Sequence, residues 1–161
     1  MAQDVAVTAV HAIWPTLAVD GEADERVGGL ITGMLVSHRL GAPALLQLEL
    51  IATFPDDLGH VRFVVPERLR LGATIAVEMG EASSTMFSGH ITAIEQQWSD
   101  QSPTVRVTAL DRLHQLRYGQ RTRAFDKLPV SDIVAQLADN HGLQVEVSAT
   151  ELQITVPLVQ L

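Results

Sequence analysis

The feature that most constrains this chain is the stretch from Val105 to Val147, which joins two kinds of structure. In its first part, Val105, Val107 and Ala109 alternate with polar residues, and this period-two pattern is typical of a half-buried strand. A connector rich in arginine follows, and after it comes the pattern of a short helix. We infer that one structural unit ends and another begins within this stretch.

The helix pattern covers residues 131–140. Ser131 is placed to cap the first turn, where Asp132 complements the helix dipole. Gly142 is placed to end the helix in the left-handed conformation. The apolar stripe that we expect to be buried consists of Ile133, Val134 and Leu137. A second strand, Leu143 to Ser148, is predicted to begin directly after the helix.

The N-terminal two thirds of the chain are dominated by strand patterns. Strands are predicted over residues 12–19, 30–38, 44–54, 73–79, 84–98 and 104–110. Asp20-Gly21 marks a turn, residues 22–29 are predicted as a loop, and Gly89 indicates a bulge or sharp bend. The residues expected to form the core are Leu46, Leu48, Leu50, Ile75, Val77, Ile91, Val105 and Val107. Several antiparallel strands with a single helix predict a small barrel or sandwich over residues 12–116.

Composition favours a folded chain without a membrane span. Hydrophobic residues make up 47% of the sequence and the mean hydropathy is +0.18, which is sufficient for a packed core. No window approaches the roughly 18–20 apolar residues of a membrane helix. Residues 1–11 lack the basic segment of a secretory signal and are expected to be a poorly ordered or docking tail. The absence of cysteine removes disulfides and thiolate chemistry, and fits folding in the cytoplasm.

The net charge of −8 hides a basic segment. Six of the eleven basic residues lie between Arg106 and Lys127, against only Asp111 and Asp126, so this window is +4 and the rest of the chain is −12. A nucleic-acid surface would have to act against that acidic remainder, and it would lack interleaved aromatic residues. We therefore expect this basic segment to form a protein interface or a domain junction and not to bind nucleic acid. The candidate residues of this interface or junction are Arg112, Arg117, Arg121, Arg123 and Lys127.

Patterns that carry catalysis or metal binding are weak throughout the sequence. The six histidines form no HExxH or HxxxH pair. Asp111 and His114 would approach each other if the chain turns helical there, and we interpret them as a surface pair. His141 precedes the helix-ending glycine, where a cation caps the last turn. Ser88 lacks the GxSxG elbow, and no phosphate-binding glycine loop is present. The sequence therefore predicts a non-enzyme with no cofactor and no metal.

Four segments carry a resemblance to a known family. They are Ser88 to Glu95 (SGHITAIE), Val107 to Leu116 (VTALDRLHQL), Arg123 to Phe125 (RAF) and Ser131 to Leu143. Their order and spacing resemble the late control gene D proteins, which are baseplate hub proteins of contractile phage tails. These are related to the N-terminal part of the valine-glycine repeat spikes of type VI secretion and to the spikes of extracellular contractile injection systems. The resemblance is clearest from about Leu71 to Leu143.

The resemblance implies a structural protein of the phage virion tail, or of an injection particle assembled in the cytoplasm. It implies a homotrimer that joins the inner tube to the spike and baseplate proteins. The fold expected from it is mainly β: a tail (1–11), a tube-like β-barrel domain (12–116), a basic connector (117–129) and the start of a smaller α+β domain (130–161). Because the family's chains continue further, we expect this second domain to be truncated.

Two alternatives remain open at the level of sequence. A stand-alone ligand- or carbohydrate-binding β-barrel would be monomeric and would need an aromatic-lined groove, although only 4% of the residues are aromatic. A tail-associated hydrolase would need a catalytic site that the sequence does not display.

Overall fold

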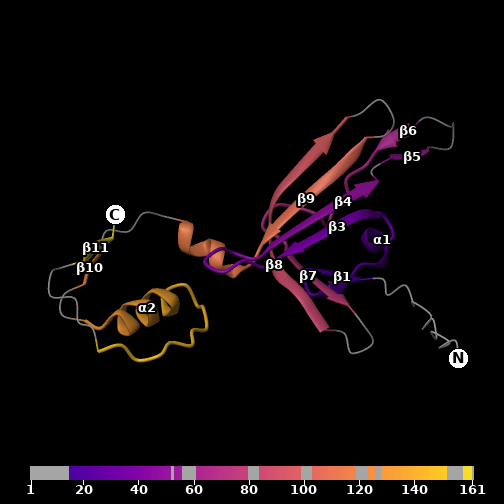
Figure 1. Cartoon of the computed structure of the whole chain (residues 1–161). Helices are drawn as coiled ribbons and strands as arrows, with labels where there is room; N and C mark the ends of the chain where they lie inside the picture. Colours follow the sequence, from indigo (N-terminus) through magenta and orange to yellow (C-terminus); the bar gives the residue numbers. More distant parts are fainter. Residues whose placement is uncertain are drawn as a thin grey trace, which may run out of the picture.

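The computed structural model describes residues 15–51, 53–55, 61–79, 84–98, 103–118, 123–125, 128–151 and 158–160. The fold is mainly β, as predicted, with one large antiparallel sheet (Figure 1). Its strands, in sheet order, are β2 (Glu22–Ala23), β1 (Thr16–Val19), β7 (Thr74–Met79), β8 (Ser84–Gln97), β9 (Thr104–Leu110), β4 (Leu45–Ile51) and β3 (Ile31–Ser37). None of the helices in the described ranges is long and apolar enough to cross a membrane.

The remaining elements are short. The first helix, α1 (Glu25–Gly28), lies between β2 and β3 in the chain, and the hairpin β5 (Thr53–Pro55) and β6 (Val61–Phe63) follows β4. A 3₁₀ helix, η1 (Arg112–Arg117), follows β9. The last elements are β10 (Arg123–Phe125), α2 (Val130–Asp139) and β11 (Leu158–Gln160). Figure 1 shows α2, β10 and β11 at one end of the molecule, apart from the large sheet.

Strand β8 shapes the sheet because its two halves have different partners. Residues 84–90 pair with β7, residues 90–97 pair with β9, and only His90 belongs to both ladders. Gly89 lies at this change of partner. A Cβ atom on Gly89 would lie 2.2 Å from the carbonyl oxygen of Leu110, so only glycine fits here. The predicted irregularity is present, and the register shifts lie on either side of Gly89, at Met86 and Thr92.

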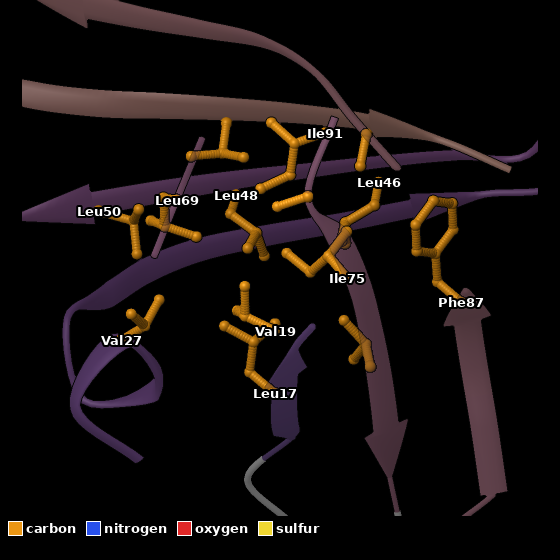
Figure 2. Packing of buried hydrophobic residues seen from close by; sticks show 14 of the residues in the cluster. Leu17, Val19, Val27, Leu46, Leu48, Leu50, Leu69, Ile75, Phe87 and Ile91 are labelled. Atoms are coloured by element: carbon orange, nitrogen blue, oxygen red, sulfur yellow. The ribbon is translucent and has the colours of Figure 1, made fainter. Parts of the chain in front are cut away.

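One hydrophobic core lies on the inner face of this bent sheet. All eight residues predicted for the core are buried in a single cluster. Leu17 and Val19 of β1 belong to the same cluster as Leu48 of β4, although three strands separate β1 from β4 in the sheet (Figure 2). Side chains of such distant strands can meet only because the sheet is strongly curved.

The predicted β-barrel is not confirmed, whereas a strongly curved sheet, the other form that the strand patterns allow, is present. Within the described residues the hydrogen-bonded ladder begins at β2 and ends at β3, and these two strands do not pair with each other. Helix α1 lies beside this opening and contributes Val27 to the core. The amide of Asp24 donates to the carbonyl of Leu17 (2.8 Å), which holds the start of α1 against β1. The observed architecture is therefore an open, curved sheet with one helical turn at its gap.

The segment after the first turn differs from the prediction. Asp20 and Gly21 form the expected turn, with positive φ angles of 51° and 81°. Residues 22–29 were expected to be a loop, but they contain β2 and α1. The side chain of Asp24 explains the helix, because its Oδ1 accepts a hydrogen bond from the amide of Val27 (3.0 Å) and so caps the first turn.

The predicted helix near residue 131 is present, but its cap is not the one expected. Helix α2 begins at Val130, and the residue before it, Pro129, is the N-cap. Amides of Asp132 and Ile133 both donate to the carbonyl of Pro129, so the helix is already established before Ser131. Ser131 is buried, its amide donates to Thr150 Oγ1 (3.1 Å), and its hydroxyl makes no cap hydrogen bond. The proline, with its fixed φ, takes the position assigned to the serine.

The end of α2 agrees with the prediction, whereas the strand after it does not. Gly142 adopts φ +60°, and the amide of Leu143 donates to the carbonyl of Ala138 (2.9 Å), as in a Schellman motif. His141 Nδ1 lies 2.9 Å from the carbonyl oxygen of Leu137, consistent with its predicted capping role. Residues 143–150, however, contain no strand. No strand in the described part of the chain pairs with them, and an alternating pattern without a pairing partner does not form a strand.

Candidate functional site

The five basic residues predicted for an interface or junction are only partly within the described structure. Arg112 and Arg117 lie on η1, and both are exposed. Arg123 begins β10, where it pairs with Gln160 of β11. Arg121 and Lys127 lie outside the described residues. The described part of the candidate site therefore consists of η1 and the elements around it.

Asp111 fixes η1 to the end of the sheet. Its Oδ1 accepts a hydrogen bond from the amide of Leu113 (3.0 Å) and caps η1, while its Oδ2 accepts one from the amide of Ala44 (2.9 Å). The amide of Asp111 also donates to the carbonyl of Ala44 (3.1 Å). One side chain thus joins the end of β9, the start of β4 and the first turn of η1. This arrangement sets the direction in which the basic connector leaves the sheet.

His114 packs η1 against the bend of β8. The chain forms a helical turn after Asp111, as the predicted pairing of Asp111 with His114 requires. His114 Nδ1, however, contacts the backbone oxygen of Asp111 and not its carboxylate. The prediction of a surface pair is wrong, because His114 is only 5% exposed. Its ring centroid lies 5.8 Å from that of His90 and 5.2 Å from that of Tyr118. His114 is therefore a packing residue of the η1–β8 contact.

Apolar side chains surround the arginines of η1. Leu113 and Leu116 of η1 are exposed, and Tyr118 directly after it is 64% exposed. A short helix with a buried histidine on one side and exposed leucines on the other presents a mixed apolar and basic face. Interfaces between proteins are enriched in arginine and aromatic residues, so this face has the composition of a contact surface. The sequence predicted the arginines of this face but not its leucines or Tyr118, although all of these residues lie in the same segment of the chain.

Arg112 also reaches the turn that ends α2. A Cβ atom on Gly142 would lie 3.6 Å from Arg112 Nη2, so the guanidinium lies beside this turn. Residues 128–151 contain four acidic residues and no lysine or arginine: Asp132, Asp139, Glu146 and Glu151. The basic η1 segment thus lies beside an acidic segment that includes α2, and their opposite charges favour the contact.

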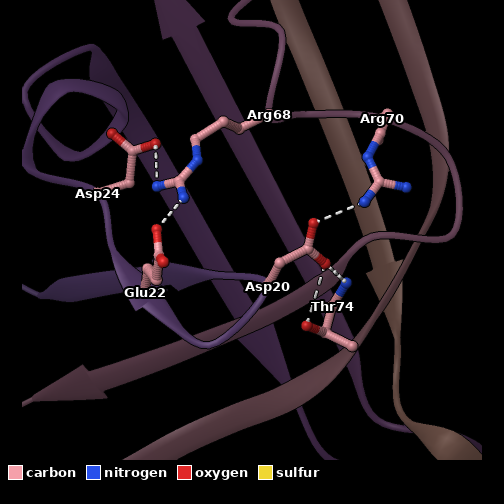
Figure 3. Close-up of polar contacts among 6 residues, drawn as sticks. All are labelled: Asp20, Glu22, Asp24, Arg68, Arg70 and Thr74. Carbon is pink, nitrogen blue, oxygen red and sulfur yellow. Dashed lines mark hydrogen bonds and ion pairs between the residues drawn. The ribbon is translucent and has the colours of Figure 1, made fainter.

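A second polar cluster, at the turn between β1 and β2, has a structural role (Figure 3). The carboxylate of Asp20 accepts hydrogen bonds from the amide of Thr74 (3.0 Å) and from Arg70 Nη2 (2.8 Å). The bond from the Thr74 amide, aided by the charge of Arg70, lowers the pKa of Asp20 below its usual value. Arg68 pairs with Glu22 and lies 3.7 Å from Asp24 Oδ2. These contacts tie the turn to the loop before β7.

Metal-ligating clusters are not found in the part of the chain that the structure describes. No group of three or more histidine, aspartate or glutamate side chains there could hold a metal ion. His90 and His114 are neighbours, but no third ligand accompanies them. The expectation of a protein without catalysis, cofactor or metal remains a prediction.

Comparison with solved structures gives a consistent group of neighbours. A 43 kDa tail protein of the MuSo2 prophage from Shewanella oneidensis matches with a TM-score of 0.64 and 15% identity, over 89% of this chain and 43% of that one. A type VI secretion system component of E. coli, described as structurally similar to two tail proteins of bacteriophage T4, matches with a TM-score of 0.55 and 16% identity, over 90% of this chain and 38% of that one. The fold is that of phage tail proteins.

A tail protein from Neisseria meningitidis has the same fold, with a TM-score of 0.52 and 13% identity over 81% of this chain and 34% of that one. This chain therefore spans less than half the length of these three neighbours. No family model matches the sequence, and no curated protein matches it. At these identities the likeness rests on the fold.

Proposed function

We propose that this chain is a structural component of the baseplate hub of a contractile phage tail or a related injection system, of the late control gene D type. The observation that carries the proposal is the extent of the structural match. It covers 89% of this chain against the prophage tail protein, so it extends beyond the large sheet. The resemblance of residues 71–143 to the late control gene D proteins supports the same assignment independently of the structure.

In this proposal the curved sheet is the tube-like domain. A hub adapts an inner tube to a spike, and it acts through strand edges and sheet faces that contact other chains. Residues 12–116 would form this domain and would close into a barrel, residues 117–129 would connect it, and residues 130–161 would begin the second domain. The assembly would be a homotrimer with the tube above it and the spike below.

The contact face of the proposed hub is the surface of η1. We define it by Arg112, Leu113, Leu116, Arg117 and Tyr118, all of which are exposed. Arg121, Arg123 and Lys127 extend the basic character of this segment along the chain. Because the connector starts here, the face would serve either the junction with the second domain or the contact with a neighbouring subunit. Both uses bring η1 against protein and not against nucleic acid.

The test is assembly with the inner tube protein encoded in the same genome. The full chain is co-expressed with that protein, and the products are measured by light scattering and by negative-stain electron microscopy. The expected result is a complex with threefold symmetry at one end of the tube. A full-length protein that remains monomeric at tens of micromolar, with the tube protein present, would contradict the hub function.

A further inference from the structure

The connection between β3 and β4 carries a leucine at its tip. Leu40 is fully exposed, more so than any other large apolar side chain among the described residues. The amide of Ala42 donates to the carbonyl of Arg39 (3.3 Å), which closes a tight turn around this leucine. Gly41 has a positive φ of 76°, a conformation that glycine adopts without strain. The turn therefore presents one apolar side chain to whatever contacts this end of the sheet.

Both sides of this turn are attached to the sheet. Before the turn, His38 Nε2 lies 3.0 Å from the carbonyl oxygen of Met86 in β8. After the turn, Ala44 is joined by two hydrogen bonds to Asp111, where η1 begins. The turn is thus held in one position beside η1. An apolar projection that is already fixed loses little conformational freedom when it binds a partner.

An apolar pocket lies at the other end of β3, and Figure 1 shows α1 and η1 at opposite ends of this strand. The pocket has a volume of about 640 Å³ and is lined by β3 on one side and by β1, β2 and α1 on the other. Ile31 and Met34 line it from β3 and are half-buried, so part of their apolar surface is open to a partner. The described lining also includes Asp24 and Glu25, but no lysine or arginine.

The turn and the pocket complement each other in charge and in apolar character. Residues 38–44 contain Arg39 and no acidic residue, whereas the described lining of the pocket carries only acidic charges. Opposite charges around an apolar contact select the partner and speed the encounter. The seven residues of β3 extend over about 23 Å, so Leu40 cannot reach the pocket of its own chain. Only a second copy of the chain can bring the two together.

We propose that Leu40 of one copy of this chain enters the pocket at the start of β3 in a second copy, with Arg39 beside Glu25 at the edge of the pocket. The two surfaces differ, and each copy has one of each, so successive contacts either close into a ring or continue as a filament. The proposed homotrimer corresponds to a closed ring. This inference rests on the proposed function for that ring, and it deepens the proposal by naming the two surfaces through which copies meet.

Sedimentation velocity of the full chain alone, over a range of concentrations, tests this contact. Leu40→Asp should weaken self-association at least about tenfold, because it places a charge in an apolar pocket. The matched control is Leu71→Asp, since Leu71 is also an exposed leucine but does not line the pocket. This control should associate as the wild type does. Circular dichroism verifies that both variants are folded.

Charge reversal tests the pairing of the two surfaces. Arg39→Glu and Glu25→Lys should each weaken self-association, and the double variant should recover it, because the two charges have only been exchanged. A mixture of Leu40→Asp with Glu25→Lys should form dimers that grow no further. The first variant keeps its pocket and the second keeps its turn, so a single contact between them remains intact.

Three results would overturn the proposal. They are a wild type that does not self-associate at tens of micromolar, equal association of the wild type and Leu40→Asp, and no recovery in the double variant. The tube protein is absent from these measurements. Self-association through this contact can therefore succeed or fail independently of the tube complex that tests the hub function.

Discussion

Asp111 and Ala44, which are 67 residues apart, exchange two hydrogen bonds at the end of the sheet: the amide of Ala44 donates to Asp111 Oδ2 (2.9 Å), and the amide of Asp111 donates to the carbonyl of Ala44 (3.1 Å). The same carboxylate caps η1 through the amide of Leu113. A single side chain therefore holds two strands and the following helical turn in one arrangement. This arrangement orients the contact face of η1.

Removing that carboxylate should weaken the end of the sheet. We expect Asp111→Ala to lower the free energy of unfolding by about 1–2 kcal/mol, because it removes the cap of η1 and leaves the amide of Ala44 without its partner. Asp111→Asn retains one acceptor oxygen and should cost less. Urea denaturation followed by circular dichroism measures both. Equal losses for the two variants would show that the hydrogen bonds of the carboxylate are not the cause.

Gly89 should be the least replaceable glycine of the described sheet. A Cβ atom there would lie 2.2 Å from the carbonyl oxygen of Leu110 and 2.7 Å from the ring of Phe87. We expect Gly89→Ala to destabilise the protein by about 1–3 kcal/mol or more, because the close atom belongs to the backbone and cannot move cheaply. The control is Gly28→Ala, where nothing lies within 4 Å. Thermal unfolding of the two variants should differ clearly, and similar melting temperatures would contradict the close approach.

The core of the curved sheet should respond to the loss of side-chain volume. Leu48 is fully buried, and Leu48→Ala should cost about 2–5 kcal/mol through lost burial and the cavity that remains. Leu35 on β3 is 52% exposed, so Leu35→Ala should change the stability by no more than about 0.5 kcal/mol. Denaturant midpoints of both variants provide the comparison. A small effect at Leu48 would argue against a single core shared by β1 and β4.

The turn between β1 and β2 should make stability depend on pH at the acidic end. The pKa of Asp20 is lowered in the folded protein, chiefly by the hydrogen bond from the Thr74 amide and by the charge of Arg70. A lowered folded-state pKa contributes stability that is present above the unfolded pKa, about 3.9, and is lost as the pH falls through the folded value.

Asp20→Asn should therefore destabilise the protein near neutral pH and have less effect near pH 3 or below, a direction set by the linkage relation. Asparagine tolerates the positive φ of 51° at this position, so the backbone of the turn is kept. Denaturation of the wild type and of Asp20→Asn, near neutral pH and again near pH 3, measures the difference in their free energies of unfolding. An equal loss at both values would show that the charge of Asp20 makes no contribution.

The contact face of η1 should be needed for assembly and not for folding of the large sheet. Reversing Arg112 and Arg117 to glutamate changes two exposed side chains, so the sheet should remain folded. Association with other chains should weaken if the face is an interface between subunits. Arg26→Glu on α1 is the control, because it changes an exposed charge away from η1. Light scattering and circular dichroism together separate lost assembly from lost folding.

Tight binding of the wild type to random duplex DNA, with a steep dependence on salt, would refute the protein-interface assignment.

The functional surface was accessible to sequence reasoning only in part. The cluster of arginines after β9 is visible as a local excess of charge, and Arg112 and Arg117 do lie on one short exposed helix. The burial of His114 was not predictable, because it depends on His90, which is 24 residues earlier and lies at the bend of β8. In the same way, the sequence could not show that Pro129 and not Ser131 caps α2. The amide of Ser131 donates to the hydroxyl of Thr150, which is 19 residues later in the chain.

The sequence by itself determined the strands of the large sheet other than β2, and the buried side of those strands that have a regular alternation. Leu46, Leu48 and Leu50 could be assigned to the core because side chains alternate along a strand, and this alternation is a local property of the chain. The tertiary structure alone decided which strands pair, how β8 serves two ladders, where the sheet stays open, and that residues 143–150 form no strand. Strand pairing and burial depend on residues that are distant in the chain, so a local pattern contains no information about which partner is present.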